Sequence, residues 1–394
     1  MAISNSFTYI AFLMFIAGSI LVLEKKSGWK VFRLVPALVW IYLINMAFCT
    51  IGLYSSEACD IAYGAVKNNI LYAMIFVMLL RCDIRKLFKM TGRMAAIFLG
   101  SSLSIGIGFV IGYPIFRNYL GNDTVGAVSA LFASWIGGSA SMAAMQDAFP
   151  VNSGAFGCAL ALDTVCYSLW IAILLFSKRF EGKWNKAVKA DTGKLDGISL
   201  SIDNQENANT AKFHDWLFLI GISLLVSAIC QWLGAKISAV AIHAGLTLFD
   251  TGTFTTLIVT VLGLICAMTP LGKALAKDDL SEIYLYAVIS LLASRASLTE
   301  LVSAPMWVVF GLFILAVHTM VVFLLSKLFH WDMCMNSIAS LANIGGQASA
   351  SVIATTYNRN FVAIGIIMGI FGEVLGNFAG LGMYALLRFF GSFL

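Results

Sequence analysis

The chain has 394 residues, of which 60% are hydrophobic and only 11% are charged. A soluble domain of this size cannot bury so much apolar surface, so the composition excludes a soluble globular protein and indicates an all-α polytopic membrane protein. The net charge of +5 does not indicate a nucleic-acid partner, because the Lys and Arg residues cluster beside apolar runs, as membrane topology requires.

Ten long apolar runs predict ten spanning helices. They cover residues 7–23, 34–54, 66–80, 94–114, 154–177, 216–233, 252–270, 282–298, 305–326 and 360–387. The first run has no basic segment before it and four basic residues after it, from Lys25 to Arg33. This order predicts a retained first helix whose N-terminus lies outside.

Two further apolar segments, 124–149 and 332–357, are interrupted by glycine pairs. Each could cross the membrane as a broken helix, or turn at the glycines and leave on the side where it entered. Re-entrant hairpins place most of the 25 Lys and Arg residues in the cytoplasm, whereas two crossing segments put the basic stretch 178–214 outside. The positive-inside rule therefore favours hairpins, although broken spanning helices also occur in transporters.

With hairpins, each half of the chain has five spanning helices and one hairpin. Because five is odd, the halves have opposite orientation, and the chain is predicted to be two inverted repeats. The first repeat is residues 1–177, the second is 215–394, and 178–214 is a solvated cytoplasmic linker. The first hairpin would enter from outside and the second from inside, and both chain termini would lie outside.

The third helix of each half has only a short stretch of strongly apolar residues. Asn68 and Asn69 precede its apolar part in the first half, and Ser294 and Arg295 follow it in the second. Paired short segments indicate a transport site at the repeat interface. Arg295 would pair with an acid or a substrate carboxylate there, or else extend to the membrane surface.

The helix after each glycine pair carries one acid, Asp163 in the first half and Glu373 in the second. A charge inside an apolar run costs at least about 2.5 kcal/mol and is normally kept for function. The alternative is a protonated acid that hydrogen-bonds a neighbouring helix. His318, which is also within an apolar run, is either a proton carrier or an interhelical hydrogen-bonding group. We expect ion coupling at Asp163, Glu373, Asn377, Gln146 and Thr355.

The glycine pairs are the predicted substrate site. A glycine break allows close approach, and the helix that restarts after it presents free N–H groups with partial positive charge. The neighbouring hydroxyl and amide groups could hold Na⁺, the candidate metal, or a solute. The alternative is close packing of small residues between membrane helices. The predicted substrate-binding set is Gly137, Gly138, Ser139, Ser141, Asn343, Gly345, Gly346, Gln347, Ser349, Asn68, Asn69 and Arg295.

The segments WIGGSASMAAMQDAF and SLANIGGQASASVIATTYNRNFVAIGIIMGIFGEVLGN resemble the two hallmark segments of the YjcL-like bacterial membrane proteins, domain of unknown function family 819. The likeness extends over essentially the whole chain. That family is distantly similar to the bile-acid, glutamate and 2-hydroxycarboxylate sodium symporters and the cation–proton antiporters. The similarity implies two inverted repeats, a mobile transport domain, a scaffold domain and often a homodimer, in a bacterial cytoplasmic membrane.

By motif match, the resemblance also implies that both glycine pairs, with Ser139 and Gln347, lie at the centre of the site. The sequence departs from those symporters directly after the glycines, where it reads GGSA and GGQA. The substrate therefore does not carry over. The bile-acid symporters have crossing broken helices, so that geometry stays open beside the hairpins.

The leading functional hypothesis is a secondary transporter of a small organic solute, anionic solutes included, coupled to Na⁺ or H⁺. No ATP-binding motif or metal-site cysteine spacing is present, and we expect no cofactor. A passive channel or a non-transporting scaffold is the alternative. An intramembrane enzyme is the third class, and neither GxSxG nor HExxH supports it.

Overall fold

The computed structural model describes residues 2–29, 31–32, 37–82, 85, 92–190, 211–243, 251–296, 304–358 and 361–391. Within these ranges every regular element is a helix. The first half contains α1 (Ser6–Ser27), α3 (Ala37–Thr50), α4 (Glu57–Leu79), α5 (Gly92–Leu120), α6 (Val125–Gly137), α7 (Ser139–Ala148) and α8 (Ser153–Ser177). The second half contains α10 (Phe213–His243), α11 (Thr251–Ala267), α12 (Lys277–Ala293), α13 (Ala304–Phe329), α14 (Met333–Ile344), α15 (Gly346–Tyr357) and α16 (Val362–Gly391).

Polar side chains fix where several of these helices begin. Asn5, Ser56, Asn152 and Asp332 each accept a hydrogen bond from a backbone N–H in the first turn of α1, α4, α8 and α14. Such capping satisfies N–H groups that have no partner within the helix. The helix starts are therefore defined by local chemistry, and the helix lengths by the apolar runs that follow.

Seven helices among the described residues are long and apolar enough to cross a membrane: α1, α4, α5, α8 with its extension to Val188, α10, α13 and α16. Their most apolar windows have mean hydropathies from 1.3 to 2.7. All ten predicted spans are helical, but α3 and α11 have only 14 and 17 residues. The 17 residues of α12 include the acidic Asp278, Asp279 and Glu282, so it is less apolar than its neighbours.

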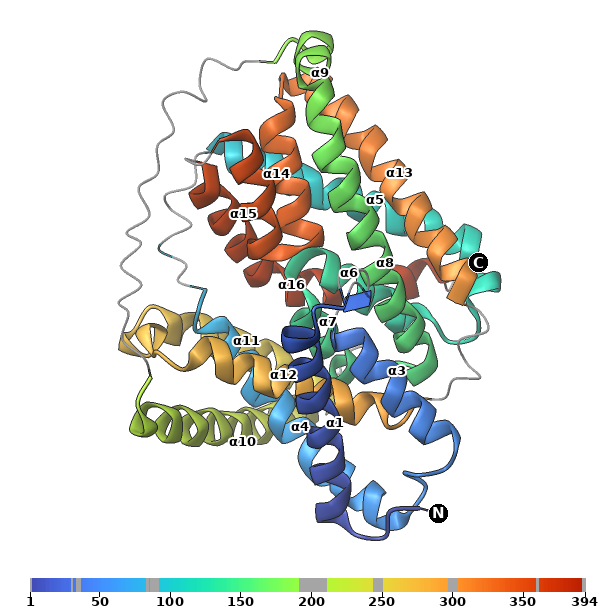
Figure 1. Ribbon diagram of the computed structural model, residues 1–394, viewed down its shortest axis with the longest axis vertical. Coiled ribbons are helices and arrows are strands. Elements are labelled where there is room, and N and C mark those ends of the chain that lie inside the picture. Colours follow the sequence, from blue (N-terminus) through green and yellow to red (C-terminus); the bar gives the residue numbers. More distant parts are fainter. Residues whose placement is uncertain are drawn as a thin grey trace.

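Two groups of helices make up the molecule, as Figure 1 shows. The α4 group consists of α1, α3, α4, α10, α11 and α12, in which α4 packs along α12. The α16 group consists of α5, α6, α7, α8, α13, α14, α15 and α16, in which α5 packs along α13 and α16 along α6 and α15. The seam between the groups is formed mainly by α7 and α16 against α4 and α11.

Both glycine segments fold back on themselves. A methyl group added at Gly126, at the start of α6, would lie 2.3 Å from the carbonyl oxygen of Pro150, just after α7. Ser337 near the start of α14 likewise hydrogen-bonds Tyr357 at the end of α15, over 3.4 Å. The two arms of each segment therefore lie side by side, with their outer ends together.

The predicted linker 178–214 is partly structured. A short 3-10 turn, Lys178–Phe180, leads into α9 (Glu181–Val188), whose Trp184 ring contacts Phe323 of α13 and whose Val188 carbonyl accepts a hydrogen bond from His330. These tertiary contacts stabilise a helix that is too short to form alone. Residues 191–210 of the predicted linker lie outside the described residues, and its last two residues already belong to α10.

Candidate functional site

The two glycines of each pair have different roles. Gly137 and Gly345 permit close packing: a methyl group added at Gly137 would lie 2.7 Å from Cα of Gly376, and one at Gly345 would lie 2.6 Å from the ring of Tyr167. Gly138 and Gly346 have φ angles of 85° and 71°, and an added methyl group would meet no atom within 4 Å. The packing interpretation thus applies to the first glycine of each pair, and the helix-break interpretation to the second.

One face of helix α16 contacts both hairpins. Its Gly376 touches α6, and its Gly369 touches the start of α15, where an added methyl group would lie 2.5 Å from Cα of Gln347. Ser141 of α7 donates a hydrogen bond to the carbonyl oxygen of Gly137 over 3.3 Å, next to the same contact. The two helix breaks are therefore held on one helix.

Glu373 on α16 joins the second hairpin to the α4 group. Its Oε1 accepts a hydrogen bond from Gln347 Nε2 at 2.7 Å, and its Oε2 accepts one from Cys82 Sγ at 3.1 Å. The neighbouring Arg81 also approaches Asp278 at 3.7 Å. Burial alone would lower the pKa of Arg81, but the carboxylates of Glu373 and Asp278 outweigh it and raise that pKa above the usual arginine range.

Sequence reasoning missed Arg81 and Cys82, because it assigned residues 81–93 to a cytoplasmic loop. One signal was available: Arg81 follows the third helix of its half directly, as Arg295 follows the third helix of the other half.

Asp163 on α8 contacts the first hairpin. Its Oδ2 accepts a hydrogen bond from Ser134 at 3.0 Å, and Ser134 precedes the break at Gly138 by four residues. Its Oδ1 is buried and has no hydrogen-bond partner among the described residues. A buried carboxyl oxygen without a partner is energetically unfavourable, so this oxygen is available to a proton, an ion or a solute.

Asn377 connects α16 to α11 across the seam. Its Nδ2 donates to Thr260 Oγ1 at 2.9 Å, while its own Oδ1 is buried and unpartnered within the described part of the chain. Thr256 lies one turn from Thr260 on α11, and its hydroxyl oxygen is buried without a partner too. Neutral oxygens of this kind suit a hard cation such as Na⁺. The described residues hold no group of three His, Cys, Asp or Glu side chains that could bind a metal ion.

A second set of polar residues meets elsewhere on the seam. Asn68 and the acid Asp147 line a polar cavity of about 410 Å³, whereas the predicted Gln146 is not among its lining residues. Asp147 accepts hydrogen bonds from Lys67, at 2.5 Å, and from the Tyr72 hydroxyl. The amide groups of Asn69 and Gln231 hydrogen-bond each other at 2.8 Å beside it. Asp147, which follows the first glycine pair in the sequence, is thus the charged group at this end of α7.

The remaining predicted residues are divided between the hairpins and distant places. Asn343 accepts from Ser102 at 2.7 Å, and Ser349 bonds Tyr167 at 2.8 Å, so both link the second hairpin to neighbouring helices. Ser139 begins α7 directly after the first break. Two predicted residues lie apart from the others, and Arg295 pairs with an acid as expected. Arg295 binds Asp60 and the Cys59 carbonyl at the start of α4, and Thr355 donates to Ser351 on an exposed helix face.

His318 forms part of a complete hydrogen-bonded chain. Its Nδ1 is 2.6 Å from Ser104 Oγ, and its Nε2 is 2.8 Å from Ser340 Oγ, which also accepts from Trp170. Ser104 donates its proton to the Ser101 carbonyl, so Nδ1 is the donor and Nε2 the acceptor of a neutral ring. Every polar atom of His318 is satisfied without a charge. This geometry favours the hydrogen-bonding interpretation over the proton carrier.

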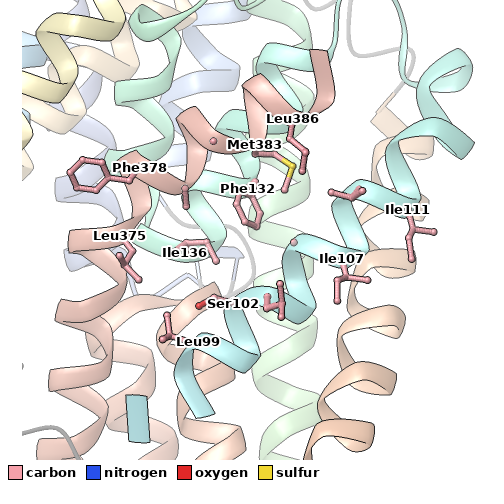
Figure 2. Close-up of a pocket in the computed structure, with 15 residues that line it drawn as sticks. Leu99, Ser102, Ile107, Ile111, Phe132, Ile136, Leu375, Phe378, Met383 and Leu386 are labelled. Carbon is pink, nitrogen blue, oxygen red and sulfur yellow. The ribbon is translucent and has the colours of Figure 1, made fainter. Parts of the chain in front are cut away.

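An apolar cleft of about 640 Å³ opens between α5, α6 and α16, and Figure 2 shows its side chains. Ser102 supplies the one polar side chain in its described lining, and Leu99, Leu103 and Ile111 are about half exposed. Such a wall suits lipid acyl chains rather than a polar solute. Ser102 links this face to the candidate site through its hydrogen bond to Asn343.

The long apolar helices and the polar groups buried between them define a helical multi-pass membrane protein. The family model described as "Protein of unknown function (DUF819)" matches residues 11–390, so the chain belongs to that family. The chain is also similar to "Uncharacterized membrane protein YjcL" of Bacillus subtilis (strain 168). The two are 24% identical over 361 residues, which cover 89% of this chain and 88% of that protein.

Proposed function

We propose that the protein is a secondary active transporter that moves a small organic solute across the membrane and is coupled to Na⁺ or H⁺. One observation carries the proposal. Two helix breaks, at Gly138 and Gly346, lie beside one face of α16, and an acid on an adjoining helix contacts each hairpin. Broken helices and buried acids beside a seam are typical of substrate and ion sites in secondary transporters.

We further propose that residues 1–177 and 215–394 are inverted repeats joined by the linker 178–214. The ends of α4 and α12 support this. The backbone N–H groups of residues 80, 81 and 82 donate to the carbonyl groups of 76, 78 and 79, and those of residues 294, 295 and 296 donate to 290, 292 and 293 in the same pattern. Arg81 then approaches Asp278 at the start of α12, as Arg295 binds Asp60 at the start of α4.

A two-fold axis that exchanges α4 and α12 would generate both ion pairs. The surrounding contacts support the same exchange, since α4 packs against α10 and α11, and α12 packs against α1 and α3. In this arrangement the hairpins are re-entrant, the first from outside and the second from inside, and both termini are outside. The protein would be a homodimer in the bacterial cytoplasmic membrane, without a cofactor and without enzymatic activity.

Transport would then proceed by alternating movement of the α16 group against the α4 group. The bonds of Glu373 to Gln347 within the α16 group and to Cys82 across the seam make this acid sensitive to that movement. An ion that binds Glu373 competes with these bonds. Ion binding would in this way alter the free energy of the seam, which is the physical requirement for coupling.

The alternative is a passive channel or a non-transporting scaffold. Ion-dependent stability of the purified protein distinguishes the coupled transporter from a passive channel or scaffold. We expect the melting temperature of the purified protein to differ between Na⁺ and K⁺, or to vary with pH, in a manner lost in Glu373→Gln and Asp163→Asn. The matched control is Glu57→Gln at the exposed start of α4.

Flux is tested in vesicles that contain the purified protein. Solute uptake driven by a Na⁺ or proton gradient, and abolished in Glu373→Gln, is the expected result. Two results together would argue for the scaffold instead. Uptake would be unchanged in Glu373→Gln and Asp163→Asn, and the melting temperature would not depend on the ion present.

A further inference from the structure

The polar cavity on the seam has walls from both helix groups. Asn68 and Tyr72 come from α4, Gln231 from α10, and Thr251, Gly252 and Thr255 from α11, while Asp147 comes from α7 of the α16 group. Six of these seven residues have polar side chains, in a chain that is 60% hydrophobic. Asn68 and Gln231 lie near the middle of α4 and α10, so the cavity is beside the central turns of two long helices.

Among the described residues, the cavity has no uncompensated charge. Asp147 is the one charged residue of the described lining, and Lys67 neutralises it at 2.5 Å while the Tyr72 hydroxyl binds its second oxygen. The side chains of Lys67 and Asp147 are only 12% and 13% exposed, so water screens this pair weakly. A carboxylate solute would find no free cation in this described lining, and an organic cation no free anion.

The described hydrogen bonds leave both acceptors and donors of the cavity without a partner. Asn68 Oδ1 is buried and has no partner among the described residues. Thr255 donates its hydroxyl proton to the Thr251 carbonyl at 2.7 Å, which leaves its oxygen able to accept. The Nε2 donors of Gln231 are taken by Asn69 Oδ1 at 2.8 Å and Ser227 Oγ at 3.2 Å. The Asn68 Nδ2 group and the Thr251 hydroxyl remain as donors. An occupant with hydroxyl groups, which both donate and accept, matches these atoms.

We propose that this cavity is the solute site and that it binds a small uncharged compound rich in hydroxyl groups. The inference rests on the transporter proposed above and narrows its substrate class, because neutral donors and acceptors suit hydroxyl groups and the compensated charges disfavour ions. Movement of the α16 group would carry Asp147 away from α4 and α11 and so open the cavity. The same movement separates Asp147 from Lys67 on α4, so this ion pair breaks as the solute is released.

The test measures equilibrium binding to the purified full-length protein of three probes: erythritol, ethanolamine and succinate, which are respectively neutral, cationic and anionic. The variants are Asn68→Leu and Thr255→Val. Thr319→Val is the matched control, because Thr319 on α13 donates to the carbonyl four residues earlier, as Thr255 does, but lies outside the cavity. Erythritol is expected to bind saturably and to lose about tenfold in affinity in each cavity variant, the effect of one hydrogen bond left unmade.

Three results would overturn the assignment: stronger binding of succinate or ethanolamine than of erythritol, no saturable binding of any probe, or equal affinity in wild type, Asn68→Leu and Thr255→Val. Erythritol flux into vesicles separates this inference from the transporter proposal. Binding that depends on Asn68 without any flux would support the site and contradict transport. Ion-driven flux of a charged probe that is unchanged in Asn68→Leu and Thr255→Val would support transport and contradict the assigned site.

Discussion

Gly138 is a residue whose backbone conformation alone defines its role. Its φ of 85° and ψ of 176° fall in a region that is populated almost only by glycine. Alanine fits the space there but not the angles, so we expect Gly138→Ala to lower the free energy of unfolding by about 1–3 kcal/mol. Thermal unfolding of the purified protein measures this.

The control for that substitution is Gly221→Ala in α10, where an added methyl group also meets no atom within 4 Å but φ is not positive. Alanine there should leave stability unchanged or raise it by up to about 1 kcal/mol. Equal melting temperatures for the two variants would show that the break at Gly138 is not strained by a side chain.

Asp332 gives a prediction for pH. It caps α14 by accepting from the Met335 N–H at 2.8 Å, and its side chain is fully buried. Burial raises its pKa above the ordinary value of 3.8, against the opposing effects of the capping N–H and of Arg93 at 3.6 Å. A raised pKa means that folding favours the protonated acid. Its contribution to stability is therefore fully present below pH 3.8 and is lost as pH rises through the folded-state pKa.

Asparagine is a good helix cap that carries no titrating proton. In Asp332→Asn we expect this part of the pH dependence to disappear, with the melting temperature at neutral pH maintained or raised. Melting curves across the acidic range compare the two proteins. A variant that melts well below wild type at neutral pH would show instead that the Asp332 charge is favourable beside Arg93.

Helices α7 and α4 are linked by the ion pair between Lys67 and Asp147. Gly252 packs against the Asp147 carbonyl and Thr253 donates to that of Ala148, so α11 holds the same end of the hairpin. Removing one partner of a buried pair leaves the other charge uncompensated and costs about 3–5 kcal/mol. We expect Lys67→Met to lower stability by roughly 3 kcal/mol, near the low end because the pair is not fully buried.

A double-mutant cycle isolates the pair. Lys67→Met with Asp147→Asn should be less destabilised than the sum of the two single variants, by about 0.5–3 kcal/mol. Additive effects would mean that the two charges do not interact across this contact, and the hairpin would then be held by α11 alone.

The helices and helix breaks could be predicted from the sequence better than the contacts between them. The ten apolar runs and the two glycine breaks follow from local composition, and each is found as a helix or a helix end. Which glycine of a pair packs and which turns depends on α16, more than 200 residues away from Gly137, and no local pattern encodes it. The bond of Cys82 to Glu373 is of the same kind, since it joins residues 291 positions apart.

The residues of the candidate site also divide into those that the sequence singles out and those that only helix packing reveals. Asn68, Gln146, Asp163 and Glu373 stood out because polar groups are costly in apolar runs, and Asn68 lines the polar cavity. Thr255 and Thr256 did not stand out, because threonine is common in membrane helices and can satisfy its own hydroxyl on the preceding turn. Only the packing of α11 on α4 and α7 gives them a role.

For the whole molecule, the hairpins determine how the chain is threaded through the membrane. Asp123 lies in the exposed turn before α6, and Lys189 ends α9 after α8. If α6 and α7 form a re-entrant hairpin, the chain crosses once between these residues, by α8. If α6 and α7 cross as a broken helix, it crosses twice, and Asp123 and Lys189 lie on the same side.

Cysteines at these two positions distinguish the arrangements. A membrane-impermeant maleimide is expected to label Asp123→Cys in intact cells and Lys189→Cys only after permeabilisation, with the unaltered protein giving the background from its eight native cysteines. Labelling of both in intact cells, or of neither, would contradict the hairpin and with it the inverted repeats. The reverse order would keep the hairpin but turn the molecule over, and the positive-inside distribution of Lys and Arg makes that orientation unfavourable.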